Sequence, residues 1–325
     1  RARRAGNEYR SVSEDTNNAL KDLQTKNVEG IIIDLRTNPG GSLEEVARML
    51  GQVIKSGPVV QVRNGQGIID TYYDPDNGKQ IYAGPLAVLI NLASASASEI
   101  YSAAIQDYER GIIIGSTTTG KGTAQAQFDS LAHGQATLTQ RKFYRVTGGS
   151  TQNKGVIPDI KLIDIYNGEF GERKSKNALK WDTIPTAPFK RQGSVRPYIT
   201  KLTQSSEQRV AVDSQFNYLE ARKLIAQKGT DQKQVELDIN QRRAELIDLE
   251  KQSLNVENQR RVATGQAPYA NWESYQASID ALIESRAKMK AAKRPALAEE
   301  EVFVTESAQV LLDYAKLQST KASAK

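Results

Sequence analysis

The chain has 325 residues, with 44 Lys and Arg against 38 Asp and Glu, a net charge of +6, no cysteine and one histidine. The absence of cysteine excludes a Cys nucleophile, an iron–sulfur cluster and a Cys-based zinc site. The single histidine leaves at most one imidazole for acid–base chemistry. Basic and acidic residues are mixed throughout, so the sequence predicts no nucleic-acid partner. No run approaches the roughly 18 apolar residues that a membrane span needs.

The N-terminal third predicts strands joined by short turns and one helix. A β-branched run at 31–35 predicts a buried strand, and it leads into the turn sequence Asn38-Pro39-Gly40-Gly41. Apolar residues at helical spacing over 43–54 predict a helix. Two further runs, 59–63 and 68–73, flank an Asn-Gly pair, which predicts a β-hairpin.

The same alternation continues toward the middle of the chain. A strand at 86–90 leads into a Ser/Ala-rich segment at 93–98, followed by a helix to about Arg110 and a strand at 112–114. Residues 138–146 also have strand character. Because strands alternate with helices, we expect an α/β core built on a mainly parallel sheet.

The composition changes beyond this core. Three prolines at 185, 188 and 197 mark a linker, after which Gln, Lys, Glu, Ala and Leu dominate with helical periodicity. The apolar stripes of this part are interpreted as packing faces. We therefore expect two domains, a core over 1–190 and an α-helical domain over 191–325.

Three serines lie where the strand at 86–90 passes into the next helix, which is a common place for catalytic groups in α/β proteins. Only Ser96 has a glutamate three residues later, Glu99, so this pair matches a capping box. Ser96 would then begin the helix, leaving the amides of Ala97 and Ser98 free to bind an oxyanion. The alternative interpretation is an ordinary serine N-cap.

A lysine between two glycines, Gly120-Lys121-Gly122, follows the strand at 112–114. Together with Gly115 it matches the G-x-x-x-x-G-K part of a phosphate-binding loop, but Gly122 stands where Ser or Thr should follow. A P-loop-like nucleotide-binding protein therefore remains the alternative.

The third cluster is Asp34-Leu35-Arg36 with Asn38 and Gly40-Gly41, where a glycine amide could act as a second oxyanion donor or simply form a turn. In chain order, this cluster, then Ser94–Glu99, then Gly120–Thr123 with Gln125 resemble the C-terminal processing peptidases, and most of all the bacterial tail-specific proteases. The resemblance covers residues 7–190 strongly and the helical region more loosely. It implies a serine peptidase core like those of the crotonases and Clp proteases.

The resemblance also implies the site residues of a serine endopeptidase with a Ser–Lys dyad. Ser96 corresponds to the nucleophile, Lys121 to the general base and Gln125 to the residue that orients the lysine. The oxyanion amides correspond to Ala97 and Gly41. No metal or cofactor is implied. A lysine serves as a base only where its surroundings favour the neutral amine.

Two features limit the competing interpretations. His133 is the one candidate for a triad base, and nothing near it has a triad signature. A catalytically silent peptide-binding relative would be marked by loss of Ser96 or Lys121, and both are present.

By resemblance, the substrates are proteins with apolar, flexible C-termini, the location is the bacterial periplasm, and an adaptor lipoprotein is a candidate partner. Family members carry a peptide-binding PDZ module before the core, and tail-specific proteases add an N-terminal helical domain. The segment before Asp34 is too short for either. We therefore expect this chain to be a piece of a longer protein.

Overall fold

The structure, a computed structural model, describes residues 10–76, 80–129, 131, 133–165, 171–289 and 298–323. The chain divides into two compact units. The first comprises Arg1–Leu162, Gly168–Thr203 and Ser307–Lys325, and the second Ile163–Asn167 and Gln204–Glu306. The chain therefore leaves the first unit twice and returns to it twice.

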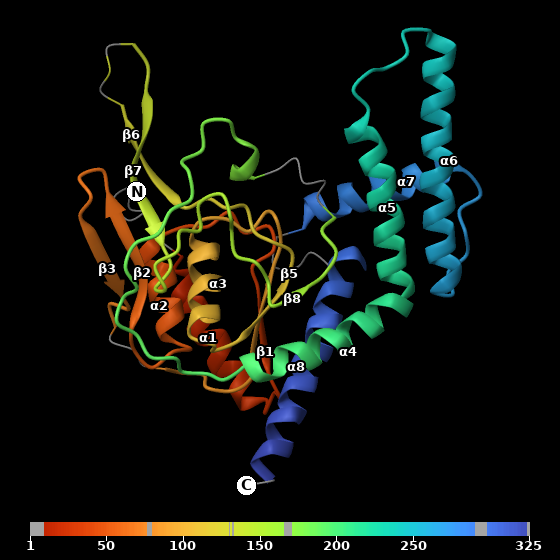
Figure 1. The fold of residues 1–325 in the computed structure, drawn as a ribbon. Coiled ribbons are helices and arrows are strands. Elements are labelled where there is room, and N and C mark those ends of the chain that lie inside the picture. The colour runs from red at the N-terminus through yellow and green to blue at the C-terminus, as the bar shows by residue number, and fades with distance from the viewer. Residues whose placement is uncertain are drawn as a thin grey trace. The chain divides into compact units, whose positions relative to one another are not determined.

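A parallel sheet forms the centre of the first unit, as the sequence predicts (Figure 1). Its strand order is β1-β4-β5-β8, with β1 at Ile31–Asp34, β4 at Leu86–Ile90, β5 at Ile112–Gly115 and β8 at Ile160–Lys161. Every side chain of β4 is buried, because this strand is flanked by β1 and β5. That position explains its continuous apolar sequence.

The first unit also contains an antiparallel sheet. Its order is β3-β2-β7-β6, with β2 at Pro58–Asn64, β3 at Ile69–Tyr73, β6 at Thr123–Phe128 and β7 at Ala136–Tyr144. The pairing of β2 with β3 confirms the predicted hairpin. Strand β6 pairs on one side only, so it forms an edge of this sheet and begins directly after the Gly-Lys-Gly sequence.

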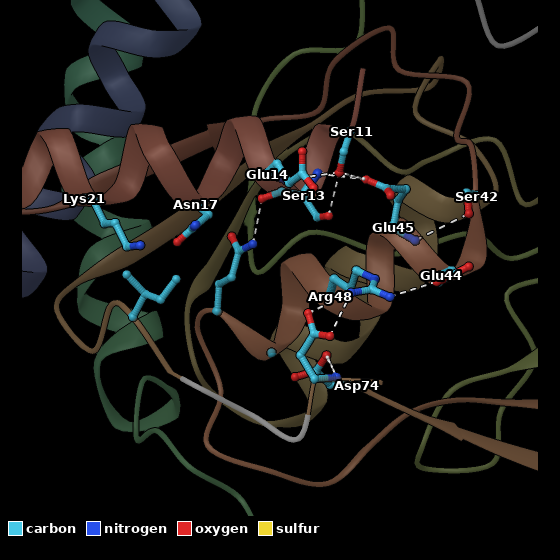
Figure 2. A pocket seen from close by; sticks show the side chains of 14 residues that line it. Ser11, Ser13, Glu14, Asn17, Lys21, Ser42, Glu44, Glu45, Arg48 and Asp74 are labelled. Carbon is cyan, nitrogen blue, oxygen red and sulfur yellow. Dashed lines mark hydrogen bonds and ion pairs between the residues drawn. The ribbon is translucent and has the colours of Figure 1, made fainter. Parts of the chain in front are cut away.

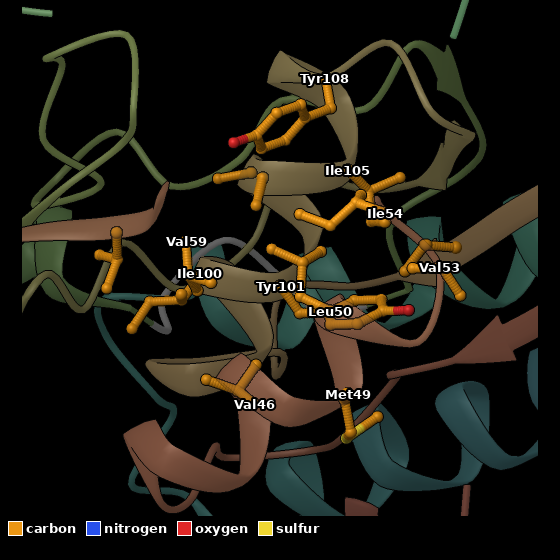
Figure 3. Packing of buried hydrophobic residues seen from close by; sticks show 14 of the residues in the cluster. Val46, Met49, Leu50, Val53, Ile54, Val59, Ile100, Tyr101, Ile105 and Tyr108 are labelled. Atoms are coloured by element: carbon orange, nitrogen blue, oxygen red, sulfur yellow. The ribbon is translucent and has the colours of Figure 1, made fainter. Parts of the chain in front are cut away.

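The helices of this unit before residue 163 are α1 at Val12–Thr25, α2 at Leu43–Gly51 and α3 at Ala97–Asp107. Helix α3 contacts α2 and also both sheets, through β2 and β5, so nearly all of its residues are buried. Figure 3 shows the packing between α2 and α3, where Leu50, Ile105 and Tyr101 are almost completely buried. Burying one such aliphatic side chain stabilises a fold by about 1.5–3 kcal/mol. The start of α3 is therefore held firmly.

The remaining elements are mostly helical. They are η2 (Glu172–Lys174), η3 (Arg196–Tyr198), α4 (Ile199–Val212), α5 (Ser214–Asp231), α6 (Ile239–Ala263), α7 (Trp272–Lys288) and α8 (Ala298–Ser323). Within the second unit, the ion pair of Arg209 with Glu306 spans 2.8 Å. None of the described helices combines the length and apolar composition needed to cross a bilayer. An α/β core with a parallel sheet and a helical C-terminal region confirms the predicted fold class.

Candidate active site

Ser96 stands at the junction between β4 and α3, as the N-cap of the helix. Its backbone has φ +58° and ψ −113°, in a region that non-glycine residues rarely adopt. Such strain persists only where the surroundings hold it, and it is common at functional sites. Ser96 is half-buried, whereas Ser94 and Ser98 on either side are buried.

The hydrogen bonds separate the three serines. The Ser94 hydroxyl donates to the carbonyl of Leu35 at 2.8 Å, and the Ser98 hydroxyl donates to the carbonyl of Asn38 at 3.0 Å. Ser96 and Glu99 form a capping box at the start of the helix, and among the described residues the Ser96 hydroxyl bonds to no neighbouring segment. Of the three, therefore, only Ser96 has a hydroxyl that is not occupied in holding neighbouring segments together.

The turn after β1 lies against the Ser96 segment. The Asn38 carbonyl accepts from the Ala95 amide at 3.0 Å, and Gly40 has φ +100°. A Cβ on Gly40 would lie 2.7 Å from the Ala95 carbonyl oxygen and 2.8 Å from the Ala97 nitrogen, so only glycine fits there. The sequence indicated the turn, but not which of its glycines makes this close approach.

The two predicted oxyanion donors have free amides. The Gly40 amide donates to Oδ1 of Asn38 at 2.9 Å. By contrast, the amides of Gly41 and Ala97 donate to no acceptor among the residues that the structure describes. Gly41 is exposed, and a Cβ added to it would meet nothing within 4 Å.

A buried carboxylate joins the serine segment, residues 94–98, to the lysine loop, residues 118–122. Glu99 is fully buried, and its Oε2 accepts from the amides of Ser96 and Lys121, both at 2.9 Å. Its Oε1 accepts from the Gly120 amide at 2.8 Å and the Thr118 hydroxyl at 2.5 Å. Burial raises the pKa of the Glu99 carboxyl, and these four hydrogen bonds oppose that effect. The sequence indicated Glu99 only as a capping residue.

Lys121 itself is half-buried, and its ammonium forms no ion pair with any residue in the described part of the chain. Among the described residues, no hydrogen bond joins Gln125 to Lys121. The Gln125 side chain is exposed, on β6, and its Nε2 donates to the Thr123 hydroxyl at 3.2 Å. His133 is also exposed, in the connection between β6 and β7.

The lysine loop is not arranged as a phosphate-binding loop. In such a loop, free backbone amides surround the phosphate and a helix follows. Here the Gly120 and Lys121 amides donate to the Glu99 carboxylate, which would repel a phosphate, and the strand β6 follows. These contacts argue against the nucleotide-binding alternative.

Asp34 and Arg36 form a two-point ion pair, with Nη2 of Arg36 2.7 Å from Oδ2 of Asp34 and Nε 3.0 Å from Oδ1. This pair stiffens the start of the turn after β1. Within the described residues, no cluster of three or more side chains suits a metal ion.

A cavity of about 850 Å³ lies apart from these residues, between α1 and α2 (Figure 2). Its described lining includes none of the residues 94–99 or 118–123. The acidic groups that line it are largely engaged in the fold: Glu45 accepts from Ser11 and Ser13, and Arg48 pairs with Glu44. The arrangement at Ser96 and Lys121 is therefore a better candidate active site than this cavity.

Comparison with known proteins finds matches among peptidases. A model of peptidase family S41 matches residues 7–162, and a model of the C-terminal domain of tail specific protease matches residues 165–316. The tail-specific protease of Haemophilus influenzae is 42% identical over 250 residues, which are 73% of this chain and 36% of that protein. The carboxy-terminal-processing protease of Bartonella bacilliformis is 36% identical over 177 residues, 51% of this chain and 41% of that protein.

Among solved structures, a photosystem II D1 C-terminal processing protease matches with a TM-score of 0.43 and 32% identity, over 47% of this chain and 39% of its own. The chain spans 36% and 41% of the two curated relatives above. The two family models together cover the described core and most of the helical region. Residues 7–162 therefore match peptidase family S41, and residues 165–316 match the C-terminal domain of tail specific protease.

Proposed function

We propose that this chain is the catalytic part of a serine endopeptidase in which Ser96 is the nucleophile and Lys121 the general base. One observation carries the proposal: the Glu99 carboxylate accepts from the amides of both residues, at 2.9 Å each. A single buried group therefore fixes the backbone of the nucleophile relative to the backbone of the base.

In the proposed reaction, the neutral amine of Lys121 removes the proton from the Ser96 hydroxyl as its oxygen attacks the peptide carbonyl carbon. The resulting ammonium then gives that proton to the leaving amine as the peptide bond breaks. Water attacks the acyl-enzyme with the same lysine as base, which releases the acid product and restores Ser96. Among the described residues, no ion pair engages the Lys121 amine.

The developing oxyanion needs donors that are aimed before the reaction begins. We assign this role to the amides of Ala97 and Gly41, because both are free among the described residues while that of Gly40 is bonded to Asn38. The position of Ala97 at the first turn of α3 adds the positive end of the helix dipole.

Gln125 is retained as a candidate for orienting Lys121. Its Nε2 is bonded to the Thr123 hydroxyl, and its Oε1 has no hydrogen bond to another described residue. A change of rotamer on an exposed strand costs little, and it would let Oε1 accept from the lysine.

The wider biology of the protein is proposed from its relatives, whose names specify tails and carboxy-terminal processing. We propose that the substrates are proteins with apolar C-terminal tails, that the protein acts in the bacterial periplasm, and that an adaptor lipoprotein brings substrates to it. A catalytically silent relative is disfavoured because Ser96 and Lys121 are both present.

Cleavage of casein by the purified protein, and by its Ser96→Ala variant, tests the proposal. We expect cleavage by the wild type and none by the variant, with both equally folded by circular dichroism. A variant that keeps the wild-type rate excludes Ser96 as the nucleophile.

A further inference from the structure

The lysine loop is held by a second buried side chain, Gln152, which is 1% exposed. Both ends of its amide group are used. Its Oε1 accepts from the Gly122 amide at 2.8 Å, and its Nε2 donates to Oε2 of Glu172 at 3.1 Å. Gln152 therefore lies between the residue that follows Lys121 and a carboxylate on η2.

The approach of Gln152 to the loop is close. A Cβ on Gly122 would lie 2.5 Å from the backbone nitrogen of Gln152, so no side chain fits at position 122. The next residue, Asn153, donates its amide to the Gly120 carbonyl at 2.9 Å. Each glycine beside Lys121 is thus fixed through its amide by a different buried side chain, Gly120 by Glu99 and Gly122 by Gln152.

Glu172 also belongs to this arrangement. Its amide donates to the Thr119 carbonyl at 3.1 Å, and the neighbouring Arg173 donates from Nη2 to the Thr118 carbonyl at 3.1 Å. The carboxylate of Glu172 accepts only, so it requires the nitrogen end of the Gln152 amide to face it. The oxygen end must then face Gly122, which is the orientation that the loop needs.

We propose that Gln152 is a positioning residue for Lys121, and that Glu172 fixes the orientation of its amide. This inference rests on the proposed role of Lys121 as the base. Glutamine suits the position because it accepts from Gly122 and donates to Glu172 at the same time. A glutamate could only accept, and it would place a second carboxylate against Glu172.

Two substitutions of Glu172 test the orientation without changing Gln152. Glu172→Gln keeps an acceptor for the Gln152 amide, whereas Glu172→Ala removes it. We expect kcat to fall further in the alanine variant than in the glutamine variant, with KM unchanged. Lys176→Ala, at an exposed residue nearby, serves as the control and should match the wild type.

Gln152→Glu tests the positioning role directly. If the repulsion shifts the loop by about 1 Å, kcat should fall on the order of 10²-fold, and the rise of kcat/KM with pH should move. In the double variant Gln152→Glu with Glu172→Gln, the new glutamine donates to the new glutamate, which still accepts from Gly122. We expect the double variant to recover most of the lost kcat and the wild-type pH profile.

The results distinguish this inference from the dyad. If Lys121→Ala is inactive while Gln152→Glu keeps the wild-type kcat and pH profile, the inference is wrong and the dyad stands. If Lys121→Ala is as active as the wild type, the dyad itself is wrong. Should Gln152→Glu fail to fold, equal kcat in Glu172→Ala and Glu172→Gln overturns the inference, and a larger loss in Glu172→Ala supports it.

Discussion

The adjacent glycines at the turn after β1 provide a matched test of the site. A Cβ on Gly40 would lie 2.7 Å from the Ala95 carbonyl oxygen and 2.8 Å from both the Ala97 nitrogen and the Ser96 Cβ. Contacts below 3.0 Å force atoms to move. Two of these atoms belong to the nucleophile Ser96 and to the proposed oxyanion donor Ala97, so Gly40→Ala must displace the proposed catalytic groups.

The size of the effect follows from two terms. With φ +100°, an alanine at position 40 costs about 1–3 kcal/mol in backbone strain. Because a misplacement of 1 Å costs about 10²-fold in rate, a shift of several tenths of an ångström should lower kcat/KM by roughly tenfold or more. Gly41→Ala should lose far less in both respects, since its Cβ meets nothing within 4 Å and its amide is kept.

The assay is kcat/KM on a fluorogenic peptide, with urea unfolding of both variants as the measure of stability. Equal losses in Gly40→Ala and Gly41→Ala would refute the reasoning, as would a Gly40→Ala variant with wild-type kinetics.

Three further outcomes follow from the structure. Ser96→Ala should abolish peptide cleavage, while Ser94→Ala and Ser98→Ala keep most of it. The latter two should lose about 1 kcal/mol of unfolding free energy each, because each removes a hydrogen bond. Equal loss of cleavage in a folded Ser94→Ala protein would contradict the assignment. Gln125→Ala should lower kcat/KM several-fold without abolishing cleavage, and unchanged kinetics would remove Gln125 from the site. Burial acts to raise the pKa of Asp182, but hydrogen bonds from two basic side chains outweigh it and hold the pKa below 3.8. The stabilisation from ionised Asp182 is therefore present above pH 3.8 and lost as the pH falls through its folded pKa. The difference in urea stability between wild type and Asp182→Asn should shrink below that pH. A constant difference would contradict this account.

Local sequence patterns predicted much of the core. The continuous apolar run of β4 and the Asn-Gly hairpin are determined by neighbours within a few residues, and both are present in the structure. The start of α3 at Ser96 was likewise predictable from Glu99, three residues later. Strand β6 was not predicted, because an edge strand of alternating alanine and glutamine lacks the apolar run that marks a buried strand.

The contacts between distant segments could not be predicted from such patterns. The capping box indicated the bond between Glu99 and Ser96, but the bond from Glu99 to Lys121 joins residues 22 apart in sequence. Gln152 is further still, and no local pattern distinguishes a buried glutamine that bonds Gly122 from an exposed one. The family resemblance implied Gln125 as the residue that orients the lysine. In the structure its Nε2 donates to the Thr123 hydroxyl, and its role toward Lys121 stays a prediction.

The central claim, that Lys121 acts as a base and not as a cation, is tested most directly by Lys121→Arg. Arginine keeps the charge and nearly the reach of lysine, but it stays protonated at any accessible pH. A positioned base contributes on the order of 10²–10⁴ in rate, so we expect at least that loss of kcat/KM in a folded variant. A general base should make wild-type kcat/KM depend on pH, and the residual activity of the variant should lack this dependence. A folded Lys121→Arg protein with nearly wild-type kcat/KM would contradict the dyad and leave Lys121 as an electrostatic or structural residue.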